Sequence, residues 1–189
     1  MNDDLLDRLA AAAAETDRLR ERLASAAADE DLVDVADREI VSPIGGLLLS
    51  VTPRGLVYVA FEVEDRESVL DMLATRVGSR VLRVQAGDHV PGGIPGHTVG
   101  GMLDAAAGQV GDYMAGRRRD FDLPLDTRLA TGFRGEVQRH LAEVGYGRTA
   151  TYKQLAEELA RPGAVRAVGT ACATNPLPLV WPCHRILRS

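Results

Sequence analysis

The sequence predicts a mixed α/β chain in which a small domain of strands and helices precedes a helical domain. Two strand-like runs, residues 47–51 and 56–61, flank a Pro-Gly turn, which is typical of a β-hairpin. Two short helices, expected at 151–159 and 165–174, are joined by the turn Arg161-Pro-Gly-Ala. Short helices joined by a tight turn are typical of a helix-turn-helix.

The first 39 residues are acidic and carry leucines at helical spacing, so we expect surface helices or a partly disordered extension. Strand signals begin at Ile40, and residues 40–120 are expected to form the α/β domain. After the hairpin, Ser68 is expected to cap a helix over residues 69–77, where apolar residues recur at helical spacing.

A further short strand is expected at 81–84, followed by a Gly/Pro-rich loop and a helix at 102–116. The loop contains His89 and His97. Because no cysteine and no organised carboxylate accompanies them, we interpret them as solvated loop histidines and expect no metal site.

Residues 121–127 are predicted to link the α/β domain to a helical domain at 128–189. An apolar stripe from Phe133 to Val144 marks the first helix of that domain, and Thr149 or Thr151 is expected to cap the next one.

The composition is typical of a globular protein, and a chain that depends on a reactive thiol is expected in a reducing compartment. Of its 189 residues, 46% are hydrophobic, which is enough for a substantial core. No apolar run approaches the length of a membrane helix, and no signal peptide is recognisable, so we expect a cytoplasmic protein without a membrane partner. The two cysteines, Cys172 and Cys183, are too few for a disulfide framework.

Charge is unevenly distributed along the chain. The net charge of −5 argues against a nucleic-acid partner, but residues 128–189 hold nine basic residues against four acidic ones. Such a difference between halves is typical of an acidic scaffold that carries a DNA-facing module, although a solvated imbalance without a partner produces it too.

The second short helix has one apolar stripe and one stripe of small residues. Val165, Val168 and Cys172 are expected to pack inward. The stripe of small residues consists of Arg166, Gly169, Thr170 and Ala173, and Ala167 is a further residue expected to face DNA. A face this small suits either close approach to DNA or tight packing against another helix.

The pentapeptide Trp-Pro-Cys-His-Arg at 181–185 carries the candidate nucleophile, Cys183. A thiol becomes nucleophilic beside a helix N-terminus, a histidine or a cation. Pro182 suits the first turn of a helix, and His184 and Arg185 follow directly. The alternative is a small buried thiol after a loop.

The segment from Arg166 through Asn175-Pro-Leu-Pro to Pro-Cys-His-Arg closely resembles the active-site region of the O6-alkylguanine-DNA alkyltransferases. The resemblance extends upstream through residues 144–156 and, more weakly, to 41–50 and 113–121. It implies an N-terminal ribonuclease-H-like domain and a C-terminal winged or helix-turn-helix-like DNA-binding domain. It also implies a monomer that needs no cofactor.

The resemblance implies a role for each matching residue. Cys183 takes the alkyl group from O6-alkylguanine, and from O4-methylthymine, after the base has flipped out of duplex DNA. His184 accepts the thiol proton through a water molecule, and Asn175 organises the loop. In the minor groove, Arg166 fills the space of the flipped base. The resemblance also implies that Tyr152 crowds the rotating phosphate and lines the guanine pocket. Cys172 is implied to line the same pocket, and Arg185 to hold the local backbone or a phosphate.

In the family, the pattern continues past Pro-Cys-His-Arg with a Gly-Gly-Tyr-type loop and a helix bearing a relay glutamate. This sequence stops at Ser189, so we expect either a fragment of an active repair protein or a natural short form with weakened transfer.

Three other functions compete with alkyl transfer. A lesion-binding sensor would flip alkylguanine without accepting the alkyl group. Relatives of that kind replace the cysteine that this chain retains, whereas the missing pocket-closing loop and relay glutamate favour such a sensor or an inactive fragment. A helix-turn-helix regulator would carry polar base-reading side chains on its second helix, which has few. A Cys/His hydrolase would need an oxyanion loop, and none is evident.

Overall fold

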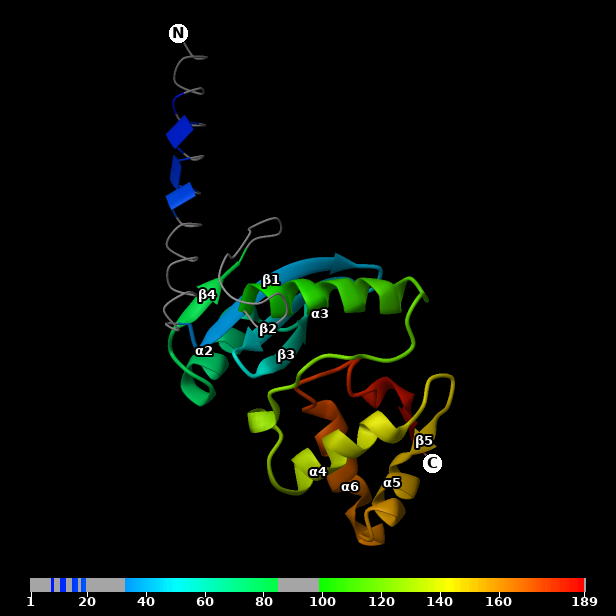
Figure 1. Cartoon of the computed structure of the whole chain (residues 1–189). Helices are drawn as coiled ribbons and strands as arrows, with labels where there is room; N and C mark the ends of the chain where they lie inside the picture. Colours follow the sequence, from blue (N-terminus) through cyan, green and yellow to red (C-terminus); the bar gives the residue numbers. More distant parts are fainter. Residues whose placement is uncertain are drawn as a thin grey trace.

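The computed structural model describes residues 33–84 and 99–188, together with scattered positions between residues 8 and 19 (Figure 1). Most of the expected acidic extension therefore lies outside the described residues. The same holds for His89, His97 and most of the Gly/Pro-rich loop.

The first half of the described chain is a four-stranded sheet with two helices, as predicted. Its elements are β1 (Val35–Ser42), β2 (Gly45–Thr52), β3 (Gly55–Phe61), α2 (Arg66–Arg76), β4 (Val81–Arg83) and α3 (Val99–Met114). The strand order is β3-β2-β1-β4. The predicted hairpin is confirmed, because β2 and β3 pair antiparallel, and β4 joins β1 in parallel.

Three sequence-based boundaries in this half are wrong. Helix α3 begins at Val99 and ends at Met114, rather than running from 102 to 116. The first strand begins at Val35 rather than at Ile40, and its first four residues, 35–38, are all buried, so no alternating pattern marks its start. Asp65, not Ser68, caps α2: its carboxylate accepts hydrogen bonds from the backbone N–H and the hydroxyl of Ser68, both on Oδ2.

The helices cover opposite faces of the sheet. Because side chains alternate along a strand, Leu47 and Leu49 point to one face, where Leu103 and Ala106 of α3 are buried with them. Leu48 points to the other face and packs in the same cluster as residues of α2. Figure 1 shows α3 lying across the sheet, with the helical half of the chain below it.

The second half of the chain is helical and leads into the C-terminal turn. Its elements are η1 (Thr127–Leu129), α4 (Gly132–His140), η2 (Leu141–Glu143), β5 (Ala150–Thr151), α5 (Tyr152–Glu158), η3 (Pro162–Ala164), α6 (Val165–Ala173), η4 (Cys183–Arg185) and β6 (Ile186–Leu187). The predicted helix-turn-helix corresponds to α5, η3 and α6. Thr151 caps α5 in a reciprocal capping box with Gln154. No helix among the described residues is long and apolar enough to cross a membrane.

Strand β3 lies at the edge of the sheet, and other parts of the chain cover this edge. The N–H of Leu56 donates to the carbonyl of Pro124 (2.9 Å), and the N–H of Val59 donates to the carbonyl of Pro176 (2.9 Å). Gly55 makes the first contact possible, because a Cβ there would lie 2.1 Å from the Pro124 oxygen. The edge strand is thereby joined to two segments of the second half.

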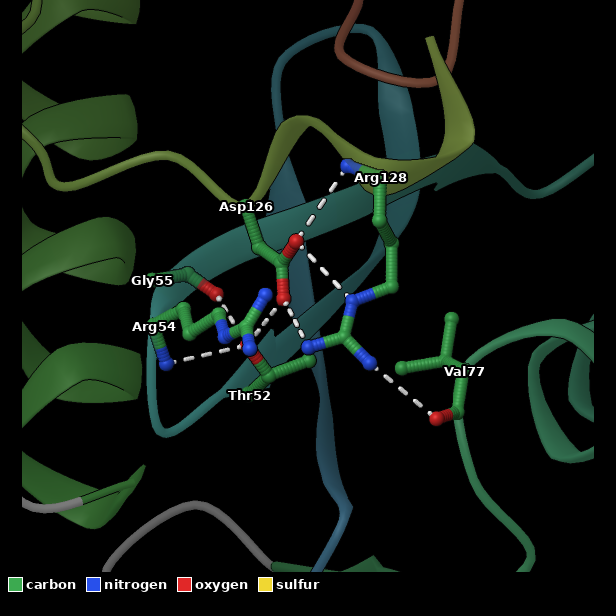
Figure 2. A network of polar contacts seen from close by, with 6 residues as sticks. All are labelled: Thr52, Arg54, Gly55, Val77, Asp126 and Arg128. Atoms are coloured by element: carbon green, nitrogen blue, oxygen red, sulfur yellow. Dashed lines mark hydrogen bonds and ion pairs between the residues drawn. The ribbon is translucent and has the colours of Figure 1, made fainter. Parts of the chain in front are cut away.

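Asp126 anchors the segment that was predicted to be a linker (Figure 2). Its side chain, 2% exposed, accepts a hydrogen bond from the Thr52 hydroxyl (2.7 Å) and pairs with Arg128 (2.7 Å). Arg128 also donates to the carbonyl of Val77 at the end of α2 (3.1 Å). Burial acts to raise the pKa of the Asp126 carboxyl, but the hydrogen bonds from Arg128 and Thr52 outweigh it and hold the pKa below its usual range.

Replacing Asp126 with Asn is expected to destabilise the fold by about 2 kcal/mol near pH 7, because a charge-assisted pair to Arg128 is lost. A carboxyl with a lowered folded-state pKa adds stability above its unfolded pKa of about 3.9, and this stability is lost as pH falls through the folded value. The difference between wild type and Asp126→Asn, measured by urea unfolding, should therefore shrink as pH falls below about 4. Asp122→Asn, at an exposed side chain in the same segment, is the control. A difference that does not depend on pH would contradict this role of the carboxylate.

Candidate functional site

The loop between α6 and the Pro-Cys-His-Arg turn is closed by Asn175. Its side-chain oxygen accepts a hydrogen bond from the N–H of Leu177 (3.0 Å), and its amide nitrogen donates to the carbonyl of Trp181 (2.7 Å). The N–H of Trp181 bonds back to the carbonyl of Leu177 (2.8 Å). One amide side chain thus fixes both ends of the loop, as expected for a residue that organises it.

Apolar side chains of this loop are anchored in the core. Leu177, Leu179 and Trp181 are all buried, with at most 8% of the residue exposed. Leu179 adopts a positive φ of 72°, which is unusual for a residue with a branched side chain and marks local backbone strain. Such strain persists only where surrounding contacts over-determine the backbone, so the loop is held in one shape.

Cys183 follows this loop and is half-buried. Its N–H donates to the carbonyl of Trp181 (2.8 Å), the same oxygen that receives the amide of Asn175. Cys183 begins a single 3-10 turn that ends at Arg185, with Pro182 as the cap rather than as the first helical residue. The expected helix N-terminus beside the sulfur is therefore only one turn, and a helix dipole contributes little there.

Cys172, the second thiol, lies in the core with 9% of the residue exposed. Burial and then the neighbouring Cys183 raise the pKa of the Cys172 thiol to about 11. Cys172 is therefore buried in this structure, and its position in a substrate pocket stays a prediction. Of the two thiols, Cys183 is the accessible one.

His184 and Arg185 project toward the sheet half of the chain. Burial and then the charge of Arg185 lower the pKa of the His184 ring, so the ring is neutral at neutral pH. Within the described part of the chain, His184 Nε2 contacts the hydroxyl of Tyr113 (3.4 Å), and its ring makes no hydrogen bond to Cys183. Arg185 donates to the carbonyl of Val144 (2.6 Å), so it holds local backbone as expected.

The outer face of α6 is accessible, as the sequence predicts. Val168 is buried, whereas Arg166, Ala167 and Thr170 are exposed and Gly169 is half-buried. Arg166 makes no side-chain hydrogen bond or ion pair with any described residue. Tyr152 is half-buried at the start of α5 and packs against the core.

Two further residues contact the site, and the sequence predicts neither of them. Tyr113, at the end of α3, is only the first residue of a weakly matching stretch. Gln138 of α4 is fully buried, and its side-chain nitrogen donates to the carbonyls of Ala171 (3.0 Å) and Thr174 (2.9 Å) at the end of α6. No local pattern marks either residue, because each meets its partners across a long sequence separation.

Among the described residues, no group of three or more potential metal ligands comes together.

Replacing Asn175 with Ala is expected to lower the free energy of unfolding by about 2 kcal/mol, because the buried N–H of Leu177 loses its partner. Loosening the loop should also speed the reaction of buried Cys172 with a thiol reagent. Thr174→Ala, at an exposed neighbour, should change stability by no more than about 0.5 kcal/mol. Unchanged stability and unchanged Cys172 reactivity in Asn175→Ala would show that the loop is held by other contacts.

Residues 132–189 match the model of the DNA-binding domain of 6-O-methylguanine DNA methyltransferase. Among solved structures, the OGT protein of Mycobacterium tuberculosis in complex with DNA has a TM-score of 0.62 and 27% identity, over 82% of this chain and 79% of that chain. The O6-methylguanine methyltransferase structure from the same organism has a TM-score of 0.63 and 28% identity, with the same coverage.

Two curated relatives carry the same name, methylated-DNA–protein-cysteine methyltransferase. The protein from Mycolicibacterium paratuberculosis is 44% identical over 82 residues, which is 43% of this chain and 49% of the relative. The inducible protein from Bacillus subtilis is 30% identical over 139 residues, which is 74% of this chain and 69% of the relative. The chain thus spans about half the length of the mycobacterial relative. The resemblance predicted from the sequence is confirmed, and the chain belongs to the methylated-DNA–protein-cysteine methyltransferase family.

Proposed function

We propose that this protein repairs duplex DNA by transferring the alkyl group of O6-alkylguanine to Cys183. One observation carries the proposal: the accessible thiol directly follows a loop closed by Asn175, within the segment 132–189 that matches the DNA-binding domain of the family model. The names of the relatives and the DNA complex of the M. tuberculosis protein support the same reaction.

The proposed reaction is a displacement at the alkyl carbon. The Cys183 sulfur forms a bond to the carbon, the bond between that carbon and guanine O6 breaks, and its electron pair stays on the guanine. His184 takes the thiol proton through a water molecule, and the released guanine takes up a proton to become the normal base. The lowered pKa of His184 favours the neutral ring, which has the lone pair that this step needs. The thioether is stable, so each chain reacts once and requires no cofactor.

The exposed face of α6 supports the proposed approach to DNA. A small-residue face is also typical of tight helix packing, but a Cβ at Gly169 would meet nothing within 4 Å. The packing of the chain itself therefore does not require glycine at this position. Glycine is required there if an external surface, such as DNA, comes close to the helix backbone.

In the proposed complex, α6 enters the minor groove and Arg166 fills the place of the flipped nucleotide. Ala167, Gly169 and Thr170 then lie against the DNA, and Tyr152 lies near the rotating phosphate. We further propose a cytoplasmic monomer, with residues 40–120 as a scaffold domain and 128–189 as the DNA-binding domain. O4-methylthymine is a second proposed substrate.

Incubation of the protein with a duplex that contains O6-methylguanine should add one methyl group to the peptide that holds Cys183, as measured by mass spectrometry. Cys183→Ser should abolish this gain and leave the affinity for DNA nearly unchanged, because the sulfur contacts no phosphate in the proposed complex. Binding of the lesion without methyl gain would identify a sensor instead. If the protein binds the modified and the unmodified duplex equally and gains no methyl group, the repair function is refuted.

Replacing Gly169 with Leu is expected to weaken duplex binding about tenfold or more, since the longer side chain holds the helix away from the groove. The fold should tolerate the change, because open space surrounds this position. Gly108→Leu, on the exposed side of α3, is the matched control, since its Cβ also meets nothing within 4 Å. Equal DNA affinity for both variants, measured by fluorescence anisotropy, would exclude the α6 face from the DNA interface.

A further inference from the structure

Gln138 joins helix α4 to the end of α6, and the two helices pack against each other (Figure 1). The side chain of Gln138 is fully buried, and its neighbours Val137 and Leu141 belong to the same core cluster as the buried residues of α6. Its side-chain nitrogen, Nε2, donates to two carbonyls, those of Ala171 (3.0 Å) and Thr174 (2.9 Å). One buried amide therefore holds two backbone groups of the other helix.

The orientation of the Gln138 amide is fixed by its partners. Nε2 has two hydrogens, and two carbonyls receive them. Turning the amide over would place its oxygen against both carbonyl oxygens. In the observed orientation this oxygen, Oε1, is buried and has no hydrogen-bond partner among the described residues. An unpaired buried acceptor costs free energy, so the favourable contribution of this polar side chain lies in the two bonds that it donates.

The two carbonyls lie where α6 cannot satisfy them itself. The last carbonyls of a helix lack partners within the helix, and the helix end carries a partial negative charge. Helix α6 ends at Ala173, and Thr174 is its C-cap. Thr174 directly precedes Asn175, whose side chain donates to the carbonyl of Trp181 (2.7 Å) and closes the loop. Gln138 therefore fixes the direction in which the chain leaves α6 and enters this loop.

We infer that Gln138 is a positioning residue for alkyl transfer, which places Asn175 and, through its loop, Cys183 relative to α6. The inference rests on the proposed function, in which α6 holds the DNA and Cys183 must reach the alkyl carbon of the flipped base. A displacement of about 1 Å between reacting groups can slow a reaction about a hundredfold. Because Gln138 is fully buried, it does not itself contact DNA. Its loss should therefore change the transfer rate and leave the affinity for DNA unchanged.

Gln138→Met retains an unbranched side chain and removes both donated bonds. The rate of methyl transfer from a duplex with O6-methylguanine should fall about tenfold to a hundredfold, with unchanged duplex affinity. Gln109→Met is the matched control, because Gln109 also holds a connecting segment, through Arg118 and Asp122 rather than through α6. It should retain the wild-type rate. A wild-type rate in Gln138→Met, or an equal loss in Gln109→Met, would overturn the inference.

Gln138→Glu keeps the shape of the side chain and makes its donor depend on pH. A protonated carboxyl has one O–H that can donate to a carbonyl, whereas a carboxylate has none and repels both carbonyls. The transfer rate of this variant, divided by the wild-type rate at the same pH, should therefore fall as pH rises from about 5 to 8. Circular dichroism at each pH confirms that the variant is folded. A ratio that is constant over this range would contradict the inference.

A double variant tests whether Gln138 acts through Asn175. If both side chains hold the same loop, Gln138→Met should slow the transfer little further once Asn175→Ala is present. Rate losses that multiply in the double variant would show two independent effects and would contradict this route.

A measurement without DNA separates this inference from the proposed function, which absence of transfer in wild type would refute by itself. In a Cys183→Ser background, the one remaining thiol is Cys172, which directly follows Ala171. Its reaction with iodoacetamide should be faster with Gln138→Met than with Gln109→Met, because the end of α6 is released. Equal rates would show that Gln138 does not hold the end of α6, and the inference would fail.

Discussion

The carbonyl oxygen of Trp181 is the point on which the candidate site depends. It receives the side-chain amide of Asn175 and the backbone N–H of Cys183, so one acceptor fixes the end of the loop and the start of the reactive turn together. The side chain of Trp181 is buried, which keeps this oxygen in place. The position of the sulfur thus follows from core packing and two hydrogen bonds rather than from a long helix.

The edge strand β3 connects this loop to the sheet. Two of its N–H groups donate to the carbonyls of Pro124 and Pro176. An unpaired strand edge can pair with other chains, and here the edge instead binds two connecting segments of the same chain. The Asp126 network fastens the first of these segments, and Tyr113 reaches the reactive turn from the same half. The acidic α/β half is therefore more than a carrier for the DNA-facing helices, since it contacts both the loop and the turn that present Cys183.

Local patterns in the sequence predict much of this architecture. The hairpin, the short helices around the Pro-Gly turn and the outward face of α6 follow from spacing, capping and turn chemistry. What depends on contacts between distant segments could not be predicted. The hydroxyl of Tyr113 meets His184 only after α3 has packed on the sheet, and the burial of Cys172 depends on how α6 packs. The resemblance predicts a pocket position for Cys172, and the structure adds that this thiol is buried.

The most direct test of the proposed reaction is its stoichiometry. A fixed amount of protein is mixed with an increasing excess of duplex containing O6-methylguanine, and the restored guanine is counted against the protein. A thiol that is consumed by the reaction predicts a plateau at one restored guanine per chain, with no added cofactor. Continued turnover beyond that plateau, or no restored guanine at any excess, would contradict the assignment of Cys183 as the acceptor of the alkyl group.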